Sequence, residues 1–186
     1  MFKTLKLPLI KTAFTILQLT LVGGILFVLF QNQDSNFIFL TVFALSSSLP
    51  LFLVGQIPKG AGLFLILAAL INVFTWSLGG PQDFGPMDEI THTYTGFAAT
   101  FFIGFLLLKN IPRLFINYPI FTFISLVSFG VTIGVFWEIY EWGLWFFLPD
   151  QHIDSITDTI TDLILDGLGA FIATTLLTLN QSFYSD

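Results

Sequence analysis

Long apolar stretches separated by short polar segments constrain the fold of this chain more than any other feature. A helix that crosses the hydrocarbon core of a bilayer needs about 20 mostly apolar residues. Stretches of about that length occupy residues 12–30, 37–57, 60–78, 88–108, 119–148 and 155–179. Charged residues make up only 10% of the chain, against about 25% in a typical soluble domain. The sequence therefore predicts an all-α polytopic membrane protein, a single domain over residues 1–186 with about six transmembrane helices.

The basic residues predict the orientation of these helices, because Lys and Arg stay in cytoplasmic loops. In a six-helix arrangement they fall on the N-terminal tail, between the second and third helices, and between the fourth and fifth: Lys3, Lys6, Lys11, Lys59, Lys109 and Arg113. All these segments lie on one side. We therefore expect both termini to be cytoplasmic and the protein to be a multi-pass component of the plasma (inner) membrane. A cleaved signal peptide is the alternative for the N-terminal stretch, which is long for such a segment.

Composition also excludes some classes of function. The chain has no cysteine, so disulfides and thiol catalysis are excluded. Its formal net charge of −6 argues against a nucleic-acid partner, which needs a basic face to meet phosphates. The lipid bilayer is the partner that the sequence predicts.

The acidic residues are distributed in the opposite way to the basic ones. All except Asp34 and Asp186 fall between Asp83 and Asp166, together with both histidines, toward the non-cytoplasmic ends of the last three predicted helices. Three pairs have the three- or four-residue spacing that places side chains on one helix face. These pairs are Asp88 with His92, Glu138 with Glu141, and Asp158 with Asp162. We expect the three helices to bring the pairs together.

An acidic side chain in the middle of a transmembrane helix costs about 2.5–3.5 kcal/mol. No Lys or Arg stands between residues 60 and 108 or after Arg113, so protons, water or a metal ion must compensate the charges. Clustered carboxylates with an imidazole suit Mg²⁺, Mn²⁺, Zn²⁺ or Fe²⁺, while two adjacent carboxylates can also share a proton. We interpret the cluster as a divalent metal site with the ligands Glu138, Glu141, Asp158 and Asp162.

The remaining polar residues have more than one interpretation. His92 is a candidate catalytic base positioned by Asp88, or a metal ligand, or a buried imidazole that Asp88 merely satisfies. Asp154, Asp158 and Glu89 also suit the first turn of a helix, where a carboxylate caps the backbone and favours the helix dipole. His152 lies in a short polar loop and is equally well a solvated residue.

Three segments resemble the YjdF-like family of bacterial inner-membrane proteins and, more distantly, VanZ-like proteins. They are MDEITHTYTGF at residues 87–97, FWEIYEW at 136–142 and DSITDTITDLILDGLGA at 154–170. The resemblance covers about residues 80–175 and implies a multi-pass membrane protein, without implying a biochemical activity. It places on the family pattern Asp88, His92, Gly96, Glu138, Glu141, Trp142, Asp158, Asp162 and Gly169. At Asp166 it leads us to expect a neutral residue.

These observations predict a metal-binding membrane protein, a hydrolase or another enzyme that acts on a lipid-linked or amphiphilic substrate at the outer leaflet. In this hypothesis the metal activates water or polarises a phosphoryl oxygen, and His92 acts as general base with Asp88 beside it. The alternatives are a proton- or cation-coupled transporter, which would use the same carboxylates, and a non-catalytic accessory protein. A transporter needs a polar path toward the cytoplasm, and Thr174, Thr175 and Thr178 are the main polar residues on that route.

Overall fold

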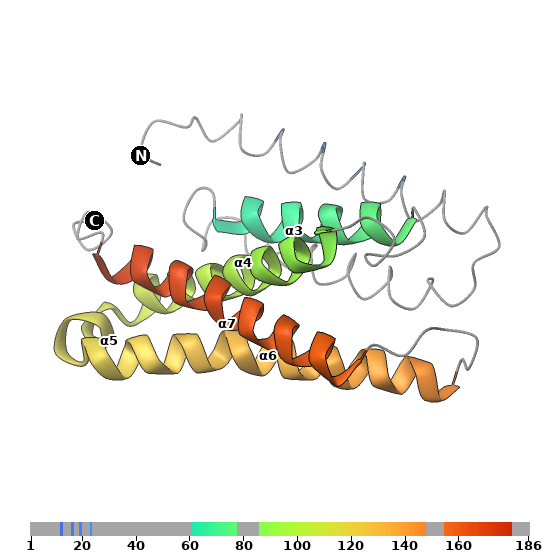
Figure 1. Ribbon diagram of the computed structural model, residues 1–186. Helices are drawn as coiled ribbons and strands as arrows, with labels where there is room; N and C mark the ends of the chain where they lie inside the picture. Colours follow the sequence, from blue (N-terminus) through green and yellow to red (C-terminus); the bar gives the residue numbers. More distant parts are fainter. Residues whose placement is uncertain are drawn as a thin grey trace. The chain divides into compact units, whose positions relative to one another are not determined.

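The computed structural model describes residues 61–77, 86–147 and 155–179, together with the isolated helical positions Thr12, Ile16, Leu19 and Gly23. Within these ranges every element is an α-helix: α3 (Ala61–Ser77), α4 (Met87–Asn110), α5 (Pro112–Asn117), α6 (Pro119–Phe147) and α7 (Ile156–Leu179), as Figure 1 shows. The predicted all-helical character is confirmed for this part of the chain. The helices predicted at residues 12–30, apart from those four positions, and at 37–57 lie outside it, so the count of six and the cytoplasmic termini stay predictions.

Three of these helices are long and apolar enough to cross a membrane. They are Met87–Asn110, Pro119–Gly143 and Ile156–Leu179, and α3 adds the shorter apolar segment Ala61–Asn72. The four helices fall on the stretches predicted at residues 60–78, 88–108, 119–148 and 155–179. The membrane character of the protein is therefore confirmed by the described helices.

The chain divides into two compact units, Met1–Met87 and Asp88–Asp186. The first unit contains α3, whose polar side chains bond to the backbone of the same helix. Asn72 donates to the carbonyl of Ala68 at 3.0 Å, and Thr75 donates to the carbonyl of Ile71 at 2.7 Å. Such bonds allow a polar residue to stay in an apolar helix, because no polar group is left unsatisfied.

The second unit contains α4, α5, α6 and α7, and local signals mark the ends of α4 and the start of α7. Acidic residues in the first turn of α4 and Lys109 in its last turn both favour the helix dipole. Ser155 caps α7, because its hydroxyl accepts a hydrogen bond from the backbone N–H of Asp158 at 3.1 Å. This agrees with the stretch predicted at residues 155–179.

The connection between α4 and α6 differs from the sequence expectation. The segment around Lys109 and Arg113 was expected to be a loop, whereas Pro112 occupies the first turn of the short helix α5, where its missing N–H costs nothing. The helix before it also extends to Asn110 instead of Leu108. Thr122 of α6 donates to the carbonyl of Leu114 at 2.9 Å and ties α5 to the start of the long helix. The signal for α5 was present as Pro112, but a six-residue helix is too short to show a periodic pattern.

Residues that recur every four positions form the interior of the second unit. Most of them are buried, as expected when the i±4 ridges of neighbouring helices interdigitate. The column on α4 is Asp88, His92, Gly96, Thr100, Gly104 and Leu108; on α6 it is Thr122, Leu126, Gly130, Gly134 and Glu138; on α7 it is Asp158, Asp162, Asp166, Ala170, Thr174 and Thr178. In each column the acidic residues occupy one end and small or apolar residues occupy most of the rest.

Two glycines let α4 and α7 approach each other to backbone contact. A Cβ added at Gly96 would lie 2.9 Å from the Cα of Asp166. A Cβ added at Gly169 would lie 2.7 Å from the backbone nitrogen of Phe97 and would collide with the carbonyl oxygen of Thr93. Close approach through small residues is a common way to associate helices in membranes. These contacts fix the register between the two helices and therefore the height of Asp166 relative to α4.

Candidate metal centre

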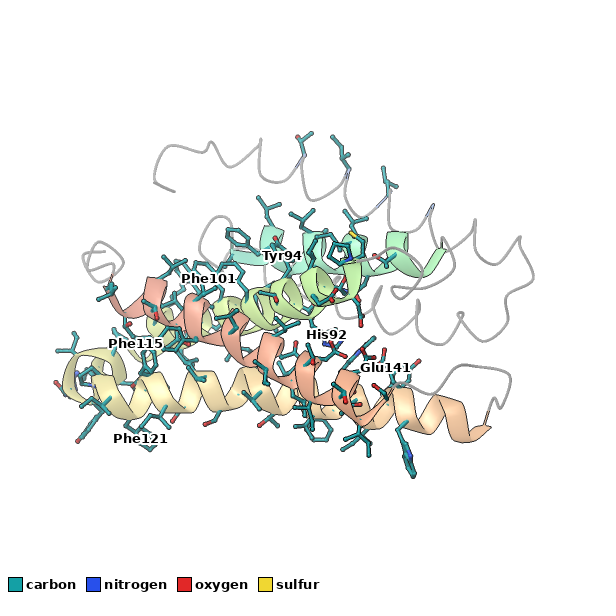
Figure 2. All side chains as sticks on the ribbon, viewed as in Figure 1. His92, Tyr94, Phe101, Phe115, Phe121 and Glu141 are labelled. Carbon is teal, nitrogen blue, oxygen red and sulfur yellow. The ribbon has the colours of Figure 1, made fainter. Side chains whose placement is uncertain are left out.

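His92 lies at the centre of the acidic cluster and is buried, with 5% of its surface exposed. It stands on the inward face of α4, one turn after Asp88. Figure 2 shows His92 and Glu141 at the same end of the second unit, while Phe115 and Phe121 lie at the other end. The arrangement around the imidazole therefore decides what this cluster can do.

The Nε2 atom of His92 faces two carboxylates. It lies 3.7 Å from Oδ1 of Asp88 and 3.9 Å from Oδ2 of Asp162. Both distances exceed the range of about 2.7–3.2 Å expected for a hydrogen bond. Metal–ligand bonds of about 2.0–2.2 Å hold neighbouring ligand atoms about 3.0–3.5 Å apart. The two distances to Nε2 are therefore a few tenths of an ångström longer than the upper end of this spacing.

Two sets of potential metal ligands meet at His92. One set is Asp88, His92 and Asp162, and the other is His92, Glu138 and Glu141. In each set one ligand atom per residue lies within 4.8 Å of the others. All three long helices contribute residues to these two sets, although Asp158 of the third predicted pair belongs to neither.

The other ring nitrogen of His92 has a different partner. Its Nδ1 atom lies 3.2 Å from Oδ2 of Asp166, within hydrogen-bonding distance. Asp166 belongs to α7, one turn beyond Asp162, and only 4% of its surface is exposed. Sequence reasoning gave this residue no role, although its four-residue spacing from Asp162 was a visible signal.

A glycine on α6 makes room for the carboxylate of Asp166. A Cβ at Gly134 would collide with Oδ2 of Asp166 and would lie 2.9 Å from its Cγ. The carboxylate is thus enclosed by backbone on the α6 side and by His92 on the α4 side. It has little freedom to take another position.

The cluster gathers several carboxylates around one imidazole. The ion pairs recorded in the described residues join His92 to Asp88, Asp162 and Asp166. Lys109 stands at the far end of α4 and Arg113 lies beyond it in α5. Carboxylates buried at this density call for a cation or for shared protons.

Between the cluster and the Lys109 end of α4, small and apolar side chains fill the space between the three long helices. A Cβ added at Gly130 would collide with Ala170 and Thr100. A Cβ added at Gly104 would collide with Leu177 and lie close to Leu126. Thr100 is fully buried, and its hydroxyl has no hydrogen-bond partner among the described residues. The polar centre is therefore confined to one end of the three helices.

The remaining candidates from the sequence lie at the margin of the centre or outside the described residues. Asp158 is half-buried in the first turn of α7, near enough to Asp88 and Asp162 to interact electrostatically with both, but it belongs to neither set of potential ligands. Glu89 is exposed in the first turn of α4, where a dipole-favouring carboxylate was the expected alternative. Structure is not described at Asp83, Asp150, His152 and Asp154.

Comparison with known proteins gives a family but no characterised relative. No curated protein matches the chain, and no solved structure matches it. The model of a family described as "Predicted membrane protein (DUF2238)" matches residues 13–182, nearly the whole chain. The match supports a membrane family of unknown function and carries neither the YjdF-like nor the VanZ-like name, which stay resemblances. With apolar helices of spanning length and a family match over this range, the chain belongs to the DUF2238 family of membrane proteins.

Proposed function

We propose that this protein binds a divalent metal ion between Asp88, His92 and Asp162. The observation that carries the proposal is the position of Nε2 of His92, which faces two carboxylates at 3.7 and 3.9 Å, too far for hydrogen bonds and close to ligand spacing. A mixed set of imidazole and carboxylate ligands suits Zn²⁺, Mn²⁺ or Fe²⁺ better than Ca²⁺, which prefers oxygen ligands only.

This assignment divides the roles differently from the sequence hypothesis. Asp88 and His92 become ligands, and Glu138 and Glu141 are left on the α6 side of His92. There they would be available as further ligands or as proton acceptors in the chemistry that a bound metal would supply. Asp158, at the margin, adds negative charge that attracts the cation.

We further propose that the centre serves a hydrolase that acts on an amphiphilic or lipid-linked substrate at the outer leaflet of the plasma (inner) membrane. The distribution of basic residues supports an outward-facing centre, because Lys109 and Arg113 stand at the opposite end of the unit. Activation of water or polarisation of a phosphoryl oxygen is the chemistry that such an ion supplies.

The layers beneath the centre favour this function over transport. A carrier needs a polar route to the other side of the membrane, whereas Gly130, Ala170 and Leu126 occupy the positions below Asp166. The hydroxyls of Thr174 and Thr178 on the same route bond to carbonyls of their own helix at 2.8 and 2.9 Å. Among the described residues, the polar groups do not continue as a chain of carboxylates or imidazoles toward Lys109.

Metal content of the purified protein tests the first part of the proposal. The protein is stripped with EDTA in detergent, loaded with Zn²⁺ or Mn²⁺, passed through a desalting column and measured by elemental analysis. We expect stoichiometric metal in the wild type and a loss of at least tenfold in affinity for His92→Gln and Asp162→Asn. Glu89→Gln is the matched control, because it removes an exposed carboxylate next to Asp88 without touching the centre. Wild-type protein that holds no metal under any loading would refute the proposal.

Hydrolysis of a defined substrate pair tests the second part. Phosphate release is compared for a long-chain lipid phosphate in mixed micelles and for a water-soluble ester with the same phosphoryl group. We expect metal-dependent release from the lipid substrate, and its loss in Asp162→Asn. Acid-dependent cation flux in proteoliposomes, without hydrolysis of either substrate, would support the transporter instead.

A further inference from the structure

We infer that Asp166 is a positioning residue that selects which nitrogen of His92 binds the metal. The inference deepens the proposed function and rests on it. Its basis is the contact of 3.2 Å between Nδ1 of His92 and Oδ2 of Asp166, two groups that come from different helices. The sequence placed Asp166 among the acids of this region but assigned it no role in the centre.

The proposed direction of this hydrogen bond follows from the chemistry of the two groups. An ionised carboxylate only accepts hydrogen bonds, so in the proposal Nδ1 carries the proton and donates it to Asp166. In the neutral imidazole the lone pair then belongs to Nε2. This is the nitrogen that faces Asp88 and Asp162. Asp166 thereby leaves Nε2, the nitrogen that faces Asp88 and Asp162, available to bind the ion.

The structure holds Asp166 in place from three directions. Its side chain is 5% exposed, its backbone packs against Gly96 of α4, and its carboxylate fills the space that the missing Cβ of Gly134 leaves on α6. The contact at Gly134 involves the carboxylate itself, whereas the contact at Gly96 involves the backbone of Asp166 and sets its height on α7. Because all three helices enclose Asp166, their axial register sets the position of its carboxylate. That position in turn sets the orientation of the imidazole ring.

Asp166 is better placed as a support for His92 than as a ligand itself. Its carboxylate meets Nδ1, whereas the carboxylates of Asp88 and Asp162 meet Nε2, on the other side of the ring. Of the two sets of potential ligands in the described residues, neither includes Asp166. A metal bound on the Nε2 side therefore leaves the hydrogen bond to Asp166 intact.

Nitrogen NMR can read this selection directly, because the chain has only two histidines. In a His152→Gln background, ¹⁵N-labelled histidine reports on His92 alone. The labelled full-length protein is titrated with Zn²⁺, a diamagnetic probe. We expect Nε2 to show the shift of a metal-bound nitrogen, while Nδ1 keeps the shift and the directly bonded proton of an N–H group.

The outcomes separate the inference from the proposed function. If Zn²⁺ changes neither nitrogen of His92, the proposed metal centre fails and the inference fails with it. If Zn²⁺ binds through Nδ1, the metal centre stands and the inference alone is overturned. Metal bound through Nε2 with a protonated Nδ1 supports both.

Two variants of Asp166 test whether the carboxylate causes the selection. Asp166→Asn keeps an oxygen that can accept from Nδ1, so we expect Nε2 to remain the ligand and the Zn²⁺ affinity to fall about 10–100-fold. Asp166→Leu removes the acceptor, so we expect a mixture of Nε2-bound and Nδ1-bound His92. Pure Nε2 binding in Asp166→Leu would overturn the selective role and leave only packing. If Asp166→Leu does not fold, Asp166→Ala takes its place, because it also removes the acceptor and the same two outcomes decide.

Discussion

Replacing Gly134 by alanine tests the geometry of the proposed centre without removing any of its polar groups. The new methyl group on α6 would collide with Oδ2 of Asp166 and lie 2.9 Å from its Cγ. Gly143→Ala is the matched control, because it adds the same methyl group to the same helix and meets nothing within 4 Å. Both changes raise the helix propensity of α6 by about 1 kcal/mol. Only the first one disturbs the metal centre.

The size of the disturbance follows from the contact distances. Ordinary van der Waals contact begins near 3.4 Å, so the Asp166 side chain must retreat by about 0.5 Å or more. Its hydrogen bond to Nδ1 of His92 is 3.2 Å long, near the upper limit of such bonds. The carboxylate must leave this contact or carry the imidazole with it. In both cases Nε2 shifts relative to Asp88 and Asp162.

Loss of a supporting hydrogen bond to a metal-binding histidine reduces metal affinity by about 10–100-fold. We therefore expect Gly134→Ala to weaken Zn²⁺ binding by about that factor, and Gly143→Ala to leave it unchanged. Affinity is measured by competition with a chromophoric chelator in detergent. The thermal midpoint of unfolding is measured on the metal-free proteins, where Gly134→Ala should lie below Gly143→Ala because overpacking costs about 1–3 kcal/mol.

A double-mutant cycle isolates the contact with Asp166. In an Asp166→Ala background the carboxylate is absent, so Gly134→Ala should cost little further metal affinity. Equal affinities for Gly134→Ala and Gly143→Ala, or losses that simply add in the double variant, would refute the reasoning. The Asp166 carboxylate would then be able to move away from the added methyl group without displacing His92.

Three further predictions concern the folding of the second unit. Gly169→Ala should strongly reduce the yield of folded protein in detergent, because its Cβ meets the backbone of α4, while Gly167→Ala, whose Cβ lies 3.4 Å from a valine methyl group, should not. Ser155→Ala should lower the free energy of unfolding by about 1 kcal/mol through loss of the α7 cap, measured by denaturant titration and reversed by Ser155→Asp. Thr100→Val should be neutral or stabilising, since this fully buried hydroxyl has no partner among the described residues; a loss above about 1 kcal/mol would show a bond that the structure lacks.

The sequence alone predicted the membrane character and the helical boundaries of the described part closely. Both depend on local properties, because apolar length and end signals such as Pro119 and Ser155 act within a few residues of chain. The pairs of acidic residues were visible for the same reason, since a spacing of three or four residues defines a helix face. Only the short helix α5 and the ends of α4 departed from expectation.

The division of roles within the cluster required the tertiary structure. Periodicity places Asp162 and Asp166 on one face of α7 but does not say which of them meets which nitrogen of His92. That choice depends on the axial register of α7 against α4, which backbone contacts at Gly96 and Gly169 fix to within a fraction of a helical turn. A shift of one turn, about 5.4 Å, would exchange Asp162 for Asp166. Sequence thus determined which residues can gather at one end of the helices, and interhelical packing decided which of them touch.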